Sequence, residues 1–211
     1  MTQSAKKIVS LILDILTFCL SLTGILLLGW KNPGQVFLFF TNDSNFFLFL
    51  TTIVFLVFEI RSFFGKEIPR AAYILSFLAL IGVVLTFLVV LLVLAPIMAK
   101  SGGVEGYFSF FTRGNFLYFH LLCPVLATVS FFLRPSPKIE RKAIPLSLLP
   151  VLCYGIPVLV LVLLRIVEPP YPFLDVYSNP VVLSVFSLFG ILLAFPLSAF
   201  LLRLFKNKKT E

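Results

Sequence analysis

Six apolar blocks, each about twenty residues or longer, make up most of the sequence and constrain its fold more than any other feature. A helix needs about 20 apolar residues to cross the roughly 30 Å hydrocarbon layer of a bilayer. The blocks therefore predict an all-α polytopic membrane protein, a bundle of six transmembrane helices. No polar linker separates the blocks, so we expect a single transmembrane domain over residues 1–211. The predicted helices lie at about 8–30, 36–60, 70–98, 114–134, 143–167 and 180–205.

The composition is that of a membrane protein rather than a soluble domain. The chain is 60% hydrophobic and 12% charged, whereas soluble domains average about 25% charged residues. The net charge of +8 does not indicate nucleic-acid binding, because the basic residues lie at block ends and form no stripe with aromatic residues. The three cysteines lie inside apolar blocks and lack Cys-x-x-Cys or Cys/His spacing. We therefore expect no disulfide, no metal site and no cofactor.

The distribution of basic residues predicts the orientation of the bundle. With the N-terminus in the cytoplasm, 13 of the 17 lysines and arginines fall on the cytoplasmic side. Cytoplasmic loops carry the excess of these residues, so we expect both termini to be cytoplasmic in a multi-pass protein of the cell membrane. The first block is long, contains Asp14 and lacks a small-x-small cleavage site, which favours a retained helix over a signal peptide.

A polar run interrupts the second block near its extracytoplasmic end, within the sequence FFTNDSNFF. Helical spacing places Thr41, Ser44 and Asn45 on one face and Asp43 on another. An ionised carboxylate at mid-membrane costs about 2.5–3.5 kcal/mol, so we expect Asp43 to face a wet cavity, a cation or a bound proton. The alternative for the asparagines and the serine is interhelical hydrogen bonding, worth about 0.6 kcal/mol for each bond.

His120 is the only histidine and lies in the fourth block, within the sequence NFLYFHLLCP. It is about 10 Å below the outer end of its predicted helix, and Thr41 is about 9 Å below the outer end of its own. This similar depth predicts that both line one cavity in the outer leaflet. The alternative is that His120 is a hydrogen-bonded core residue. Pro124 lacks an N–H and predicts a local distortion at the His120 carbonyl.

The last extracytoplasmic connection, VEPPYPFLDVYSNP, is acidic and aromatic. Tyr171 and Phe173 are residue types that suit the membrane interface. We expect this segment to be a short capping loop over the same cavity, with these two residues facing a substrate. The alternative is a plain interfacial loop.

The residue types in these segments permit acyl transfer. A threonine hydroxyl becomes a nucleophile when a histidine removes its proton, which assigns these roles to Thr41 and His120. An oxyanion would take hydrogen bonds from Asn42 or Asn45. Either Asp43 or Asp175 would orient the histidine, and the sequence leaves that choice open. The full set of candidate supporting residues is Asn42, Asp43, Ser44, Asn45, Asn115 and Asp175.

The segments FFTNDSN, NFLYFHLLCP and YPFLDV, in this order, resemble the androgen-induced / androgen-dependent TFPI-regulating protein superfamily, and most closely its bacterial membrane-protein branch. The resemblance spans nearly the whole chain. It implies a multi-pass hydrolase of fatty acid esters of hydroxy fatty acids, whose intramembrane threonine and histidine fall on Thr41 and His120. The sequence departs from the animal proteins in ending YPFLD with aspartate instead of glutamate. Its His-to-Pro interval is also one residue shorter.

Three functions are compatible with the sequence. The first is a hydrolase of lipid esters, surrounded by membrane lipids, with a threonine nucleophile and a histidine base. The second is a binding or transport subunit whose polar run hydrogen-bonds a lipid or small molecule without a covalent step. The third is a structural or regulatory membrane protein whose polar residues only lock helix packing. Loss of turnover in Thr41 and His120 variants that still fold would separate the first from the others.

Overall fold

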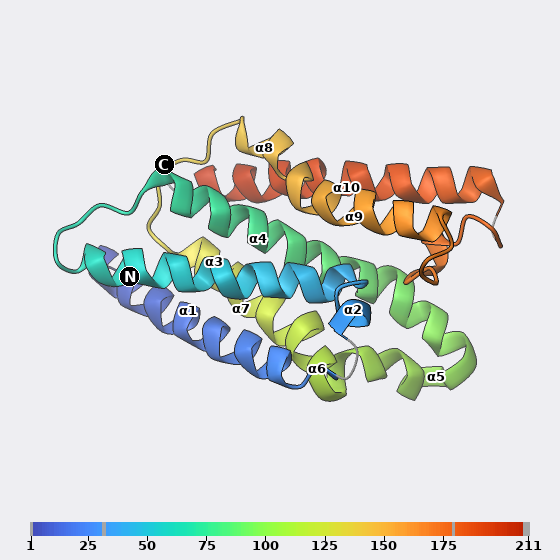
Figure 1. Ribbon diagram of the computed structural model, residues 1–211. Coiled ribbons are helices and arrows are strands. Elements are labelled where there is room, and N and C mark those ends of the chain that lie inside the picture. Colours follow the sequence, from blue (N-terminus) through green and yellow to red (C-terminus); the bar gives the residue numbers. More distant parts are fainter. Residues whose placement is uncertain (1, 31–32, 179, 209–211) are drawn as a thin grey trace.

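The computed structural model describes residues 2–30, 33–178 and 180–208, and all regular structure in these ranges is helical (Figure 1). Lys31 and Lys209, which entered the charge count above, lie outside the described residues. The α-helices are α1 (Gln3–Leu26), α2 (Pro33–Val36), α3 (Phe40–Ser62), α4 (Arg70–Val89), α5 (Ala95–Thr112), α6 (Gly114–Leu117), α7 (Cys123–Leu133), α8 (Ala143–Leu146), α9 (Leu148–Leu163) and α10 (Val181–Lys208). Two π-helical segments, η1 (Val90–Leu94) and η2 (Tyr118–Leu122), and a 3-10 turn, η3 (Pro172–Leu174), complete the chain.

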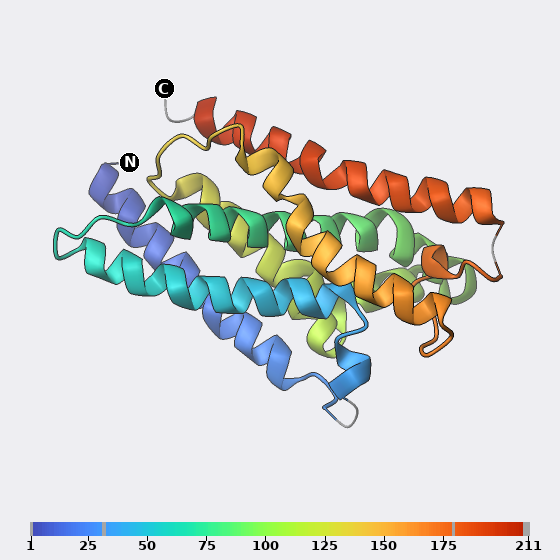
Figure 2. The same ribbon diagram turned by 45° about the horizontal axis from the view of Figure 1, so that its top comes forward.

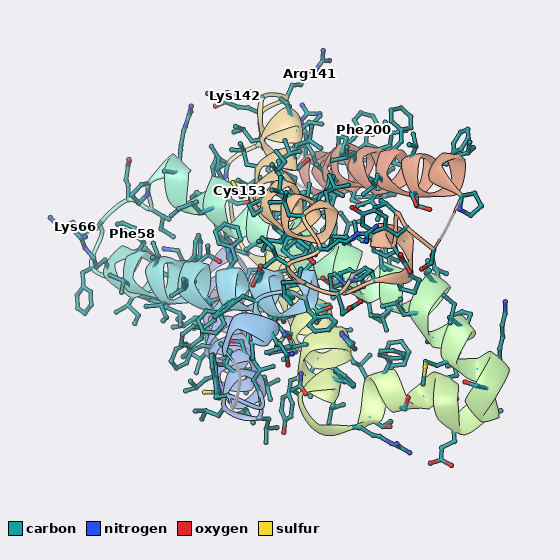
Figure 3. All side chains as sticks on the ribbon, turned by 45° about the vertical axis from the view of Figure 1, so that its right-hand side comes forward. Phe58, Lys66, Arg141, Lys142, Cys153 and Phe200 are labelled. Carbon is teal, nitrogen blue, oxygen red and sulfur yellow. The ribbon has the colours of Figure 1, made fainter. Side chains whose placement is uncertain are left out.

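Six helical stretches in the described ranges are long and apolar enough to cross a membrane, which confirms the expected number of apolar helices. Large apolar side chains such as Leu26 and Phe186 are exposed on the outside of the bundle. Cys153 and Phe200 are also exposed on helices, whereas Lys66 and Arg141 project from loops (Figure 3). This distribution is compatible with a multi-pass membrane protein. The six stretches are Gln3–Leu26, Phe40–Ser62, Arg70–Thr112, Gly114–Leu133, Ala143–Leu163 and Ser184–Lys208.

The helices form an inner group and a peripheral pair. α1 packs against α3 and α7, and α3 packs against α4, whereas α9 and α10 run along the other side of α4 (Figures 1 and 2). The most apolar window of the α4–α5 stretch is 56% buried, against 22% for α8–α9 and 11% for α10. The pair α9 and α10 is therefore attached by fewer contacts. Both ends of the chain lie at one end of the bundle, opposite η3 and α5 (Figure 1).

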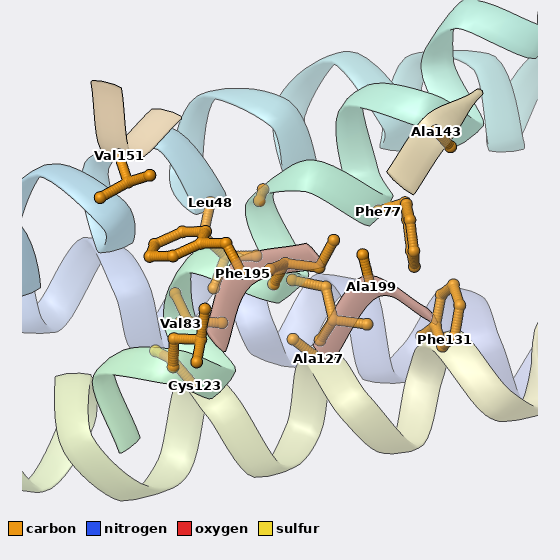
Figure 4. Packing of buried hydrophobic residues seen from close by; sticks show 14 residues of the cluster. Leu48, Phe77, Val83, Cys123, Ala127, Phe131, Ala143, Val151, Phe195 and Ala199 are labelled. Atoms are coloured by element: carbon orange, nitrogen blue, oxygen red, sulfur yellow. The ribbon is translucent and has the colours of Figure 1, made fainter. Parts of the chain in front are cut away.

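The main core lies where α3, α4, α7 and α10 meet. It includes Leu48 of α3, Phe77 of α4, Cys123 of α7 and Phe195 of α10, all less than 5% exposed (Figure 4). Phe77 stacks on Phe131 with ring centroids 5.8 Å apart. Close packing of the two rings contributes dispersion energy to this core.

The connection after the third span differs from the expectation. The predicted helices 70–98 and 114–134 leave residues 99–113 as a connection, but most of these residues belong to α5, which is interrupted at Gly103 (φ +59°). A positive φ is accessible to glycine at little cost. A Cβ on Gly106 would lie only 2.7 Å from the Met98 carbonyl oxygen, so the missing side chain lets the two arms of this turn approach closely.

Two prolines widen the helical hydrogen-bond pattern beside them. The Cys123 N–H bonds to the Tyr118 carbonyl just before Pro124, and the Ala95 N–H bonds to the Val90 carbonyl just before Pro96. Both are five-residue π-type bonds. Proline has no N–H and cannot continue the usual four-residue pattern. The distortion predicted at Pro124 is therefore confirmed, and it takes the form of the π-helical segment η2.

Gly24 allows α1 to pack closely on η2. A Cβ at this position would overlap the ring of Phe119, a fully buried residue. We predict that Gly24→Ala lowers the free energy of unfolding by about 1–3 kcal/mol, because overpacking forces the phenylalanine to move. Thermal unfolding in detergent micelles measures this effect. The matched control is Gly190→Ala in α10, where a Cβ would meet open space. Equal midpoints for Gly24→Ala and the wild type would contradict this account of the packing.

Candidate functional site

The polar run occupies the first turns of α3. The chain enters from Phe39, which is extended and acts as the N-cap without a side-chain hydrogen bond. Four of the five polar residues are buried and Asp43 is half-buried. The start of a helix leaves backbone N–H groups without internal partners, so this is where polar side chains and a hydroxyl from a neighbouring segment are needed.

The side chains of Asn42, Ser44 and Asn45 hold helices together. The Asn42 amide donates to the Val36 carbonyl over 2.7 Å, which ties α2 to α3. The Ser44 hydroxyl lies 3.0 Å from the Thr86 hydroxyl of α4. These are the interhelical contacts that the packing alternative describes.

Asn45 makes the connection from α3 to η2. Its amide donates to the Thr41 carbonyl (2.8 Å) and to the Phe119 carbonyl (3.4 Å). Its Oδ1 atom is buried without a hydrogen-bond partner in the described part of the chain. Since both amide protons are engaged, Asn45 acts in this structure as a link between two spans.

Thr41 lies against the loop between α9 and α10. Its backbone N–H donates to the Tyr171 hydroxyl over 3.4 Å, and its own hydroxyl lies within hydrogen-bonding reach of the same group. Tyr171 stacks on Phe173 with ring centroids 5.0 Å apart and meets Phe39 edge-on. Burial raises the pKa of the Tyr171 hydroxyl above its ordinary value, so this group keeps its proton as a donor. The expected capping loop therefore lies beside the start of α3.

A cavity of about 210 Å³ lies between α3, α4, α9 and α10 and extends to this loop. Its walls are almost entirely apolar and include Phe40, Leu94 and Phe195. The polar groups among its lining residues come from four segments: Thr41, Thr86, Tyr154 and Tyr171. The Tyr154 hydroxyl donates to the Leu38 carbonyl over 2.7 Å. Hydroxyl groups are therefore gathered at the α3 end of an otherwise apolar space, the usual arrangement in a site for an apolar ligand.

His120 lies in η2 and is held in one orientation. Its Nδ1 atom is 2.8 Å from the Phe110 carbonyl oxygen of α5, and its ring stacks on Phe116 with centroids 5.1 Å apart. A carbonyl oxygen only accepts hydrogen bonds, so Nδ1 carries the proton and donates it. Nε2 is then the ring nitrogen that can accept a proton. A backbone carbonyl here fills the orienting position that an aspartate fills in a catalytic triad.

The structure does not join Thr41 directly to His120. Among the described residues no hydrogen bond connects their side chains, and His120 is not one of the residues that line the cavity. Their link is indirect: Asn45 bonds to the carbonyls of Thr41 and Phe119, and Phe119 precedes His120 in the chain. The cavity is closed by α9 and α10, and none of its lining residues comes from the fourth predicted helix, 114–134.

Among the described residues, neither Asp43 nor Asp175 has a hydrogen bond to His120. Asp43 has a buried Oδ1 atom without a hydrogen-bond partner in the described ranges, and its charge acts on Tyr154 and Tyr171. Asp175 accepts a hydrogen bond from the Ser178 N–H (3.0 Å), and its bonds with Ser178 lower its pKa below the ordinary value. These contacts leave Asp175 ionised within its own turn.

Sequence reasoning missed several polar residues in the interior. Thr86 and Tyr154 line the cavity, and each is an isolated hydroxyl in an apolar block, which is the available sequence signal. Asp14, Glu59 and Arg134 form a separate buried cluster at the opposite end of α3. The signal for these three was an ionisable side chain within or at the end of a predicted span.

Comparisons with known proteins add no neighbour. No protein-family model, no curated protein and no solved structure matches this chain.

We predict that Asn45→Ala lowers the free energy of unfolding by about 1 kcal/mol, because α3 loses its bond to η2 and the Phe119 carbonyl is left unpaired. Chemical denaturation in detergent measures the change. Asn115→Ala is the matched control: Asn115 is half-buried at the start of α6, and its side chain makes no hydrogen bond within the described residues. Equal losses in the two variants would contradict the assigned role of Asn45.

Proposed function

We propose that this protein is a multi-pass protein of the cell membrane that binds a lipid ester in the cavity between α3, α4, α9 and α10. The observation that supports this most directly is the position of Thr41 at one end of an apolar cavity, beside the Tyr171 hydroxyl. An acyl chain would lie against the apolar walls, and its ester carbonyl would accept hydrogen bonds from the two hydroxyls. The excess of basic residues at the end that holds both termini supports a cytoplasmic location for that end.

The size of the cavity restricts the ligand. A volume of about 210 Å³ holds part of one acyl chain with its ester group, and the walls offer no basic side chain to a free carboxylate or phosphate. An uncharged ester is therefore a better match than a fatty acid anion, because a buried unpaired charge costs several kcal/mol.

A second candidate function is hydrolysis of the bound ester. It is favoured by the orientation of His120, whose Nδ1 is held by the Phe110 carbonyl so that Nε2 is left as a base. It is also favoured by the resemblance of the sequence to intramembrane threonine hydrolases. In this reaction the Thr41 oxygen attacks the ester carbonyl, the hydroxyl proton passes to Nε2, and the alcohol leaves with that proton. Water then cleaves the acyl-threonine bond and releases the acid.

Hydrolysis requires His120 and Thr41 to approach each other. Nε2 of His120 must come within hydrogen-bonding reach of the Thr41 hydroxyl, directly or through one water. Movement of η2 would supply this approach, because the π-type segment replaces the regular helical ladder beside Pro124.

The binding proposal predicts that Gly155→Phe blocks the ligand. Gly155 lines the cavity, and a Cβ there would meet nothing within 4 Å, so the new ring enters the space without a clash at its base. Energy transfer from Trp30, the only tryptophan, to a pyrene-labelled fatty-acyl ester in micelles measures binding. We expect affinity to fall at least about tenfold. Gly190→Phe on α10 is the control. Unchanged affinity in Gly155→Phe would rule out this cavity as the site.

The hydrolytic proposal predicts that Thr41→Val binds the pyrene ester but does not cleave it, because valine keeps the shape and removes the nucleophile. Release of the fatty acid from purified protein measures turnover, and we expect a loss of about 100-fold or more. His120→Gln is expected to lose turnover in the same way while binding persists. If the wild type binds the ester and shows no turnover, or if turnover persists in Thr41→Val, binding without hydrolysis is the function.

A further inference from the structure

A second polar site lies in the interior at the end of the bundle that holds both termini. It combines Asp14 of α1, Glu59 of α3 and Arg134 at the end of α7, which are 4%, 2% and 7% exposed. Glu59 is 18 positions after Thr41 on the same helix, so the two lie about 27 Å apart along its axis. The cluster is therefore separate from the cavity described above.

Asp14 and Arg134 neutralise each other. The Arg134 guanidinium bonds to Asp14 over 2.5 Å and also donates to the Ser76 hydroxyl of α4. The second oxygen of Asp14 accepts from the Ser130 hydroxyl, also over 2.5 Å. The guanidinium lies 3.8 Å from the centre of the Phe55 ring. The positive charge of Arg134 is thus paired with the Asp14 carboxylate, both oxygens of which accept hydrogen bonds.

Glu59 is the carboxyl group of the cluster that the pairing of Asp14 with Arg134 leaves without a cationic partner. Its Oε1 accepts from the Ser10 hydroxyl over 2.9 Å, whereas Oε2 is buried and no donor among the described residues reaches it. The groups that act on Glu59 electrostatically are Asp14 from α1 and Arg134 from α7, and Tyr73 from α4 senses its charge. Within the cluster itself, two ionised carboxylates and one guanidinium would carry a net negative charge, and an uncompensated buried charge costs several kcal/mol. Lys206 of α10 is also buried at this end, but its ammonium donates to the carbonyl oxygens of Phe131 and Arg134.

We propose that Glu59 is a proton-binding site, and that the proton on Oε2 is donated to the Asp14 carboxylate. The Asp14 side chain lies within hydrogen-bonding reach of Glu59. One proton taken from water makes the cluster neutral, and it gives the buried Oε2 atom a partner. The remaining oxygens of both acids already accept hydrogen bonds.

A proton satisfies this site better than a metal ion does. Within the described residues no group of three or more His, Cys, Asp or Glu side chains could hold a metal. Only one carboxyl oxygen here lacks a donor, whereas bound cations such as calcium take six to eight oxygen ligands. Arg134 also lies close enough to repel a second cation.

Arg134 borders two cavities at its own end of the bundle. Arg134 lines a small cavity of about 10 Å³ together with Asp14 and Ser76, close to the size that holds one water molecule. It also lines a second cavity of about 490 Å³ whose walls include Gln3 and Lys6 near the N-terminus. Protons would therefore exchange with the compartment that holds the termini.

Proton binding at Glu59 has a defined effect on stability. The unfolded chain releases the glutamate proton near pH 4.3, whereas the folded protein keeps it. Above that pH the folded state holds one more proton than the unfolded state, so stability falls as pH rises. The fall stops when Glu59 itself releases its proton within the folded protein.

Infrared spectroscopy and thermal unfolding together test the proposal on the full chain in micelles. At neutral pH the wild type should show the carbonyl band of a protonated carboxylic acid, which shifts in heavy water and is absent in Glu59→Gln. The unfolding midpoint of the wild type should fall as the pH rises above about 4.3, and Glu59→Gln should remove most of this slope. Glu67→Gln is the control, because Glu67 is exposed in a loop at the same end.

Three outcomes would overturn the proposal. The first is a wild-type spectrum without a protonated acid band, a measurement that does not depend on any variant folding. The second is an acid band or a pH slope that Glu59→Gln leaves unchanged. The third is a rise in the unfolding midpoint on adding sodium ions at constant pH and ionic strength, because this identifies the missing positive charge as a metal cation.

Discussion

Hydrogen bonds between interior side chains decide which helices of this bundle are neighbours. Large apolar side chains are common on the outside of the bundle as well as in its core, so burial of apolar side chains alone does not distinguish one helix pairing from another. Specific pairs do so here: Asp14 with Arg134 joins α1 to α7, Ser44 with Thr86 joins α3 to α4, and Asn45 joins α3 to η2. Helices α9 and α10 are the least buried of the long helices, and their bonds run from Tyr154 to the Leu38 carbonyl and from Lys206 to the Phe131 carbonyl.

The sequence was sufficient for the architecture because the spans are local features. Length and apolarity identify the six helices without any knowledge of tertiary contacts, and Pro124 identifies the distorted segment before it. The interval 99–113 was misread because glycines indicate a turn, and the single residue Gly103 supplies that turn within an otherwise helical segment. The glycine content of a short segment therefore predicts where the chain changes direction, but it does not predict how many residues lie outside a helix.

The sequence predicted the depth of the candidate residues along their helices, but it did not predict which neighbouring helix each residue faces. Rise per residue placed Thr41 near the end of its span, and the loop order placed Tyr171 at the same end, where the two meet. Whether Thr41 faces the fourth span or the α9–α10 pair depends on the order of helices around the bundle, which long-range contacts determine.

The cluster of Asp14, Glu59 and Arg134 was missed for a related reason. The count of basic residues that predicts orientation includes every lysine and arginine at the end of a predicted helix. It does not distinguish a side chain that projects into a loop from one that is buried, as Arg134 is.

Of the helices that line the cavity, α9 bends more easily than α3. Pro157 lies within α9 and cannot donate a backbone hydrogen bond to the Cys153 carbonyl, while Gly155, two positions earlier, has no side chain. The wall on the opposite side is α3, which is anchored near one end by Asn42 and Asn45 and near the other by Glu59. Bending therefore costs less on α9 than on α3. An occupant too large for the resting volume would be accommodated by outward displacement of α9, so the width of the cavity is set by this outer helix.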